Sequence, residues 1–370
     1  MIHLLGHLLP GGFQAWSVLR LLNYLSVCAI AASMTAFLLV LALMPRFIWY
    51  LHRRGLVDQV RETGVPSAFD KAGTPVMGGA VMVGSVLIAS LTWCDPSNRY
   101  VWCVLIGMVW FALIGLSDDV AKWRARSGNR GMSEKRKLLL QGAFAGLFVA
   151  FLASPWSPLP AREAGAFYVP FVKTALFNSL WLYMPIVFFF VVLVGNAVNI
   201  TDGLDGLAIV PSVLAVSTLG VFAYIMGNKV WAHYLMFPDL SVSGAGELIV
   251  VCAAFAGAGI GFLWYNAYPA QIFMGDAGSL AIGGCLATLS VVVKQEALFL
   301  ILGGLFIAEA VTSQVQDKIG IKWLGRRLFY RAPLHHQMQH TGLAETKVVI
   351  RLWIVSLILA LVSIATVKLR

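Results

Sequence analysis

Charged residues are scarce in this chain of 370 residues. Asp, Glu, Lys and Arg make up 12% of the sequence, whereas soluble domains contain roughly 25%. With 59% hydrophobic residues, the chain has too little polar surface to coat a soluble fold, and it is too apolar to be disordered. Its five cysteines are too few, and odd in number, for a disulfide framework. These shortages predict a polytopic membrane protein.

Long apolar stretches support the prediction of a polytopic membrane protein. A membrane-spanning helix needs about 20 predominantly apolar residues, and we predict ten such helices in an all-α, single-domain protein covering residues 1–370. They lie at 25–45, 76–94, 100–117, 138–153, 178–198, 206–226, 248–268, 278–293, 297–316 and 347–367. Residues 1–24 are broken by Pro10, two glycines and Arg20, so we predict an interfacial segment rather than a span or a signal peptide.

The basic residues are distributed unevenly over the predicted loops. One alternating set of loops, with the foot of the last helix, holds 19 of the 27 Lys and Arg residues. Because cytoplasmic loops carry the excess of Lys and Arg, this bias predicts that set in the cytoplasm and both termini in the periplasm. The net charge of +10 is then explained by topology, without a nucleic-acid partner.

Three acidic motifs fall in the predicted cytoplasmic loops. Asp118 and Asp119 follow the third span, and such a pair is costly unless the helix end is hydrated or a cation offsets the repulsion. In NITDGLDGLA, the spacing of Asn199, Asp202 and Asp205 would place them on one face of a helical turn. In MGDAGSL, Asp276 lies between glycines at a helix start, a setting that favours phosphate and Mg²⁺.

Two further motifs are weaker. APLHHQMQH contains His335, His336 and His340, which could form a zinc site or a basic loop that binds lipid headgroups. Adjacent histidines do not easily ligate one metal from a single helix face, and the nearby carboxylates favour Mg²⁺ over zinc. FDKAGTPVMGG offers Lys71 and Thr74, although a lone lysine at a membrane foot usually snorkels. Together the five motifs predict a Mg²⁺-dependent phosphate site on the cytoplasmic membrane surface.

These motifs resemble a known family over about residues 46–355. The resemblance rests on KAGTPVMGG, SDDVAK, GMSEKRKLLLQ, NAVNITDGLDGLA, WYNAYPAQIFMGDAGSL, APLHHQ and GLAETKVVIRLWI. They are similar to the phospho-N-acetylmuramoyl-pentapeptide transferases, a branch of the polyprenyl-phosphate N-acetylhexosamine-1-phosphate transferases. The resemblance implies an enzyme of the bacterial inner membrane, usually a homodimer. It would transfer phospho-MurNAc-pentapeptide from its UDP carrier to undecaprenyl phosphate, giving lipid I and UMP in peptidoglycan synthesis.

The resemblance also implies residue roles. Asp118, Asp119, His335 and His336 match catalytic positions, and Asp276 matches the Mg²⁺ ligand, with the acidic pair as further candidate ligands. The matched substrate-binding residues are Lys71, Thr74, Lys122, Lys137, Asn199, Asp202, Asp205, Asn266, Phe273, Gly275 and Ser279. The chain departs from the family pattern at Gln337, where a third histidine is usual, at Met338–Gln339, and at Ala68. Gln337 can still form hydrogen bonds, but it cannot become cationic.

Two other functions fit parts of the pattern. The first is the same chemistry with UDP-N-acetylglucosamine as donor. The second is a secondary transporter, whose sites lie near the bilayer midplane; among the acidic residues only Glu309 falls well inside a predicted span. The sequence leaves open whether an enzyme carboxylate attacks first or the lipid phosphate attacks directly.

Overall fold

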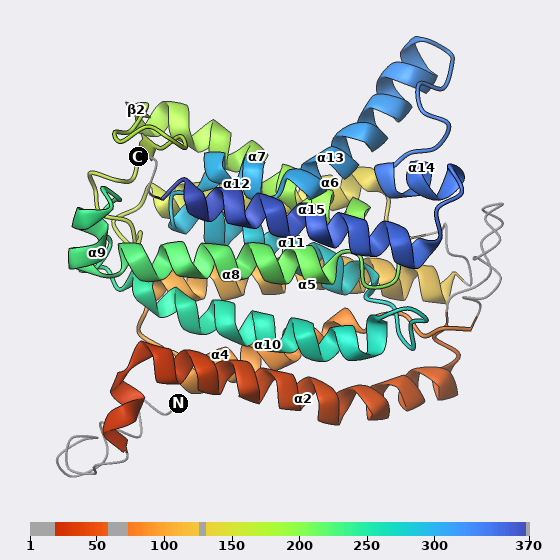
Figure 1. Ribbon diagram of the computed structural model, residues 1–370, viewed down its shortest axis with the longest axis horizontal. Coiled ribbons are helices and arrows are strands. Elements are labelled where there is room, and N and C mark those ends of the chain that lie inside the picture. The colour runs from red at the N-terminus through yellow and green to blue at the C-terminus, as the bar shows by residue number, and fades with distance from the viewer. Residues whose placement is uncertain (1–18, 58–72, 126–130, 368–370) are drawn as a thin grey trace.

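The computed structural model describes residues 19–57, 73–125 and 131–367, and it is an all-α bundle of long, roughly parallel helices (Figure 1). Helices satisfy every backbone N–H and C=O internally, which is what a segment in lipid requires. The long helices are α2 (Leu25–Arg54), α4 (Gly79–Trp93), α5 (Arg99–Arg124), α6 (Glu134–Leu152), α7 (Leu180–Thr201), α8 (Ile209–Met226), α10 (Leu248–Asn266), α11 (Gly275–Val292) and α15 (Glu345–Ala365).

Shorter elements lie mostly at the ends of the bundle. They are α9 (Lys229–Tyr234), α12 (Glu296–Leu302), α13 (Gly304–Gln314), α14 (Leu334–His340), 3-10 helices at Leu19–Asn23 and Ala245–Glu247, and a π-helical segment at Val315–Trp323. The strands β1 (Ala166–Phe167) and β2 (Phe177–Asn178) form one small antiparallel hairpin, with Ala166 opposite Asn178. The hairpin and α9 lie at one end of the bundle, and α14 lies at the other (Figure 1).

Each of the ten predicted spans corresponds to helical structure, which confirms an all-α polytopic membrane protein, although fewer than ten helices of the described residues are single long spans. Among the described residues, seven helices are long and apolar enough to cross a membrane. The predicted span 297–316 is instead two helices, α12 and α13 with its π-helical continuation, bent by 81° at Gly303. α4 has only 15 residues, and α6 begins with four charged residues, Glu134–Lys137. Most of the predicted interfacial segment 1–24, namely residues 1–18, lies outside the described part of the chain.

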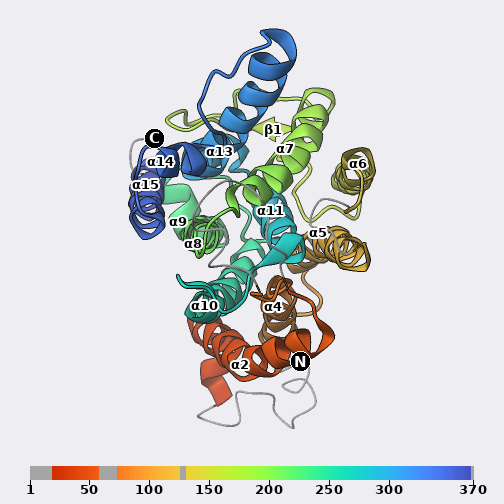
Figure 2. The same cartoon turned by 90° about the vertical axis from the view of Figure 1, so that its right-hand side faces the viewer.

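Helix α11 is the centre of the bundle. Viewed along the helices, it is surrounded by α4, α5, α7 and α8, with α10 beyond α4 and α8 (Figure 2), and every residue from Ala277 to Val292 is buried. Small residues let its neighbours approach closely, as is usual between membrane helices. A Cβ on Gly79 of α4 would lie 2.2 Å from the Cα of Gly278, and one on Gly115 of α5 would lie 2.0 Å from the carbonyl oxygen of Asp276.

The five cysteines are buried and unpaired, as predicted from their apolar surroundings. They pack as small hydrophobic side chains rather than as a redox or metal site.

We predict that Gly115→Ala destabilises the protein by about 1–3 kcal/mol, the usual cost of overpacking. The new methyl group would meet backbone atoms of α11 rather than a movable side chain, so the two helices must separate. Thermal unfolding in detergent measures this change. Gly84→Ala in α4 is the matched control, because a Cβ there meets nothing within 4 Å. Equal melting temperatures for the two variants would contradict the packing argument.

Candidate functional site

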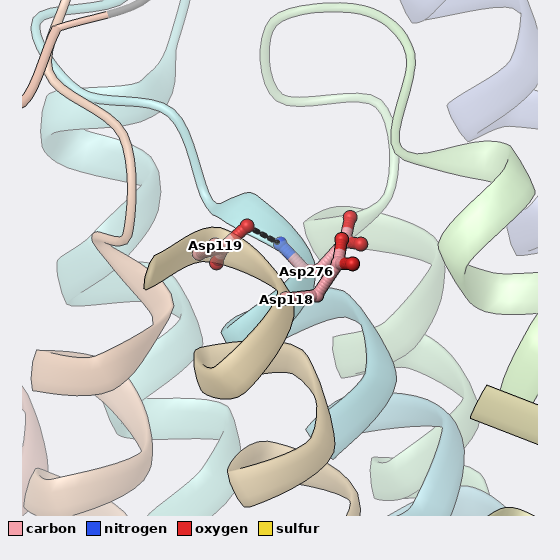
Figure 3. Close-up of side chains that lie close together, drawn as sticks. All are labelled: Asp118, Asp119 and Asp276. Atoms are coloured by element: carbon pink, nitrogen blue, oxygen red, sulfur yellow. Dashed lines mark hydrogen bonds between the residues drawn. The ribbon is translucent and has the colours of Figure 1, made fainter. Parts of the chain in front are cut away.

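Two carboxylates at the end of α5 and one at the start of α11 form an acidic cluster, Asp118, Asp119 and Asp276 (Figure 3). One ligand atom from each lies within 4.8 Å of the others. Asp119 accepts hydrogen bonds from the backbone N–H groups of Asp276 (3.1 Å) and Ala277 (2.9 Å). The first N–H groups of a helix have no partner within it, so Asp119 caps α11 from a different helix.

Two lysines offset the charge of the acidic cluster. The Nζ of Lys122 lies 2.7 Å from Asp118 Oδ2 and 3.0 Å from Asp276 Oδ2. The Nζ of Lys137, from the first turn of α6, lies 2.8 Å and 2.7 Å from the same two atoms. Each ammonium group therefore bridges both carboxylates. The Asp118 side chain is 0% exposed and that of Asp276 is 18% exposed, so Asp276 is the member of this bridged pair that a ligand can reach.

Asn199 brings a third helix to the cluster. It lies in the last turn of α7, and its Nδ2 donates hydrogen bonds to Asp276 Oδ1 (3.1 Å) and to Ser279 Oγ (2.8 Å). The Ser279 hydroxyl in turn donates to the Gly275 carbonyl at 3.1 Å. Gly275 has a φ of +75°, and a Cβ there would lie 2.7 Å from Asp119 Oδ2, so the first residue of α11 has to be small.

The predicted helical face shared by Asn199, Asp202 and Asp205 does not form. α7 ends at Thr201, and residues 202–208 make turns before α8 begins. These turns still bring Asp202 near the acidic cluster. Removal from solvent raises the pKa of Asp202 to about 8, and the carboxylates of Asp276 and Asp119 add to the shift. Asp202 is therefore mostly protonated at neutral pH.

Asp205 and Asn266 form hydrogen bonds to the backbone around these turns. Asp205 Oδ2 accepts from the N–H of Ala270 at 3.1 Å. Asn266 accepts from the N–H of Gly206 at 3.0 Å and donates to the carbonyl of Ile272 at 2.9 Å. Both side chains thus hold the 202–208 turns against the segment that leads into α11.

The segment before α4 pairs with the segment before α11. The N–H of Phe273 donates to the Pro75 carbonyl at 2.8 Å, and the N–H of Gly78 donates to the Phe273 carbonyl at 2.9 Å. This pairing brings Thr74, which is half-buried, and Phe273 to the same end of the bundle as the acidic cluster. Lys71 lies outside the described residues.

His335 is buried rather than open to a ligand. Its side chain is 1% exposed, and its Nδ1 donates to Oε2 of the fully buried Glu309 at 3.0 Å. The backbone N–H of His335 donates to the same oxygen at 3.3 Å. The other ring nitrogen, Nε2, faces Gly203, where a Cβ would lie 2.3 Å from it. The Glu309–His335 pair therefore packs directly against the turn that contains Asp202.

The rest of the histidine motif bonds locally. The rings of His335 and His336 lie 4.3 Å apart, and His336 Nδ1 donates to Gln339 Oε1 at 3.1 Å. Burial, and to a lesser degree the neighbouring His335, lower the pKa of His336, so it is neutral at pH 7. Gln337, at the position where the resemblance suggests a third histidine, accepts from the N–H of Arg331 at 2.9 Å. It fixes the loop before α14.

Sequence reasoning gave no role to the start of α15. Glu345 Oε1 accepts from the N–H of Asp205 at 3.2 Å, and Trp353 Nε1 donates to the Gly206 carbonyl at 3.2 Å. An acidic residue in the first turn of a helix is ordinary, so nothing local distinguishes Glu345. The one available signal was that both residues lie in the stretch GLAETKVVIRLWI, which carries part of the family resemblance.

The residues of the acidic cluster fit a magnesium ion. Their donor set consists of oxygen atoms alone, which a hard divalent cation prefers. The two lysine ammonium groups leave one of the three carboxylate charges without compensation, which also favours a further cation. Asp119 uses both oxygens to cap α11. Asp118 is 0% exposed, and its oxygens are occupied by the N–H of Met132 and by the two lysines. Asp276, which is 18% exposed, is therefore the better candidate ligand.

We expect Glu309→Ala to lower activity much more than Glu309→Gln. Alanine leaves the buried His335 without its partner, whereas glutamine keeps an acceptor for Nδ1. Turnover and thermal unfolding, measured on both variants, test this difference. Exposed His340→Gln, at the end of the same helix, is the control for unspecific changes in α14. Equal activity of the two Glu309 variants would show that the hydrogen bond to His335 is unimportant.

The raised pKa of Asp202 predicts a pH-dependent requirement for the divalent cation. The group is neutral below pH 8 and negatively charged above it, and the added charge attracts a cation held by the acidic cluster. The Mg²⁺ concentration for half-maximal activity should therefore fall as the pH rises through 8. In Asp202→Asn this fall should be weaker, and an identical fall in both proteins would rule out Asp202 as its cause.

Comparison with known protein families agrees with this arrangement. A family model described as glycosyl transferase family 4 matches residues 101–294, slightly more than half of the chain. The match includes all three members of the acidic cluster, both bridging lysines and the 202–208 turns. The chain therefore belongs to glycosyl transferase family 4.

Proposed function

We propose that the protein transfers phospho-MurNAc-pentapeptide from UDP-MurNAc-pentapeptide to undecaprenyl phosphate, which yields lipid I and UMP. Membership in glycosyl transferase family 4 supports the reaction class, phospho-sugar transfer to a polyprenyl phosphate. The finer assignment depends on the stretches APLHHQ and GLAETKVVIRLWI, which resemble the muramoyl-pentapeptide branch. With it we propose a single-domain homodimer in the bacterial inner membrane, with its site on the cytoplasmic face.

The observation that carries the proposal is the acidic cluster bridged by two lysines at one end of a membrane bundle. A polyprenyl phosphate can present its phosphate only at the membrane surface, because its tail stays in the lipid. A site at the helix ends meets that phosphate and a soluble nucleotide-sugar at the same level. A transporter site would instead lie near the bilayer midplane.

The residues suggest how the reaction is supported. Asp276 would hold Mg²⁺, which would neutralise charge on the donor diphosphate and make UMP a better leaving group. Lys122 and Lys137 bridge Asp276 and Asp118, so they lie where the phosphate oxygens of the donor would be bound. Asn199 orients Asp276 through its Oδ1. Asp119 fixes the start of α11 through two backbone hydrogen bonds.

We predict that Asp276→Asn lowers UMP release at least about a hundredfold, the usual effect of removing one group that stabilises charge in the transition state. The assay uses purified protein in detergent with UDP-MurNAc-pentapeptide, undecaprenyl phosphate and Mg²⁺, and chelation by EDTA should abolish the wild-type reaction. Asp95→Asn is the matched control, because Asp95 lies between α4 and α5 at the opposite end of α5. Normal turnover in Asp276→Asn would refute the proposed site.

The same assay distinguishes the donors. UMP release from UDP-MurNAc-pentapeptide but not from UDP-N-acetylglucosamine is the expected result. Activity with UDP-N-acetylglucosamine alone would keep the site and the reaction class but overturn the proposed donor.

A further inference from the structure

A second polar site lies at the end of the bundle opposite the acidic cluster. A pocket of about 380 Å³ opens between the loop before the β1–β2 hairpin, the hairpin tip, α9 and the turn after it. We call it the hairpin pocket. Helix α8, of 18 residues and about 27 Å in length, begins just after the 202–208 turns and ends three residues before α9, so the 202–208 turns and α9 lie at opposite ends of this helix. The charged and titratable residues that line the hairpin pocket are Arg162, Glu163, Lys173, Lys229, His233 and Asp239.

The carboxylates of the hairpin pocket already have local partners. Glu163 is buried, and it accepts from the Tyr168 hydroxyl at 2.7 Å and pairs with Arg162 Nε at 3.2 Å. Asp239 Oδ1 accepts from the backbone N–H of Ser241 at 3.0 Å and from its hydroxyl at 2.5 Å. The hydrogen bonds from Ser241, and to a lesser degree the charges of Lys229 and Arg162, lower the pKa of Asp239, so Asp239 offsets only part of the positive charge of the pocket.

The two lysines are different. Lys173 lies at the tip of the hairpin, and Lys229 is the first residue of α9. Neither forms an ion pair or a hydrogen bond with a residue in the described ranges. Both are exposed. Counting Arg162, the pocket holds three cationic side chains against two carboxylates. The surplus is positive, so the ligand that suits the pocket is an anion.

The surroundings of the pocket indicate that this anion belongs to a lipid. Met236 lines the pocket and is 51% exposed, and Phe171, two residues before Lys173 in the hairpin loop, is 53% exposed. Val230 and Trp231 of α9 are exposed beside it. Trp is one of the residue types enriched at the level of the lipid headgroups in membrane proteins, so Trp231 suits such a position. Phe171 and Met236 also have φ angles of 70° and 57°, a strained conformation that is concentrated at functional sites.

We propose that the hairpin pocket binds the phosphate headgroup of an anionic membrane lipid through Lys173 and Lys229, with the acyl or prenyl chain lying against Phe171 and Met236. Both lysines line the same pocket, so both ammonium groups can donate to one phosphate, and the adjacent apolar side chains suit a ligand that carries a hydrocarbon chain. This site is independent of the proposed transferase reaction.

Native mass spectrometry of the full chain tests the proposal. The purified protein is titrated in detergent with phosphatidylglycerol or with phosphatidylcholine, and the retained lipid is counted. Wild type should retain phosphatidylglycerol in preference. Lys173→Gln and Lys229→Gln should each weaken that retention about fivefold, the effect of one lysine near an anionic lipid surface, and Lys173→Arg and Lys229→Arg should keep it.

Arg99→Gln is the matched control. Arg99 lies at the same end of the bundle, over the ring of Trp156 and outside the pocket. Its substitution by glutamine removes one positive charge, as each lysine substitution does. Equal retention of both lipids by wild type, or an equal loss in Arg99→Gln, would overturn the proposal, because either result indicates diffuse surface charge. Inorganic phosphate that competes as strongly as the lipid would also overturn it, since the ligand would then be a soluble anion. Melting temperatures in phosphatidylcholine identify any variant that is simply misfolded.

Discussion

The close approach of three carboxylates where α5 meets α11, two of them buried, is the constraint on which the site depends. Charges this close repel one another, and burial makes the repulsion more costly. The protein offsets it with the ammonium groups of Lys122 and Lys137 and with two backbone N–H groups at the start of α11. The remaining negative charge favours a divalent cation, and the two ammonium groups, together with that cation, suit a phosphate ligand.

This balance requires the helices to approach almost to backbone contact. Gly115 and Gly275 leave no room for a Cβ at the crossing of α5 and α11, and Gly79 does the same beside Gly278. Around that centre, the 202–208 turns are held by Asn266, Glu345 and the Glu309–His335 pair. Residues from α10, α13, α14 and α15 thus act on the cluster without belonging to it.

Much of this could be predicted from the sequence. Apolar runs predicted the helices, and the scarcity of charge made Asp118, Asp119 and Asp276 stand out. The 81° bend at Gly303 could not be predicted, because a broken span has the same composition as a straight one. The burial of His335 was also hidden: its partner Glu309 lies 26 residues away, and only the fold brings them together. Asn199, Asp202 and Asp205 show the limit of spacing arguments, since a turn replaced the expected helix.

The central claim is that the acidic cluster holds a divalent cation through Asp276. Electron paramagnetic resonance of Mn²⁺, added as a substitute for Mg²⁺ to the purified protein without substrates, tests it most directly. The account predicts one tightly bound ion per chain in the wild type and loss of that signal in Asp276→Asn, while Asp95→Asn still binds. An unchanged Mn²⁺ signal in Asp276→Asn would contradict the account.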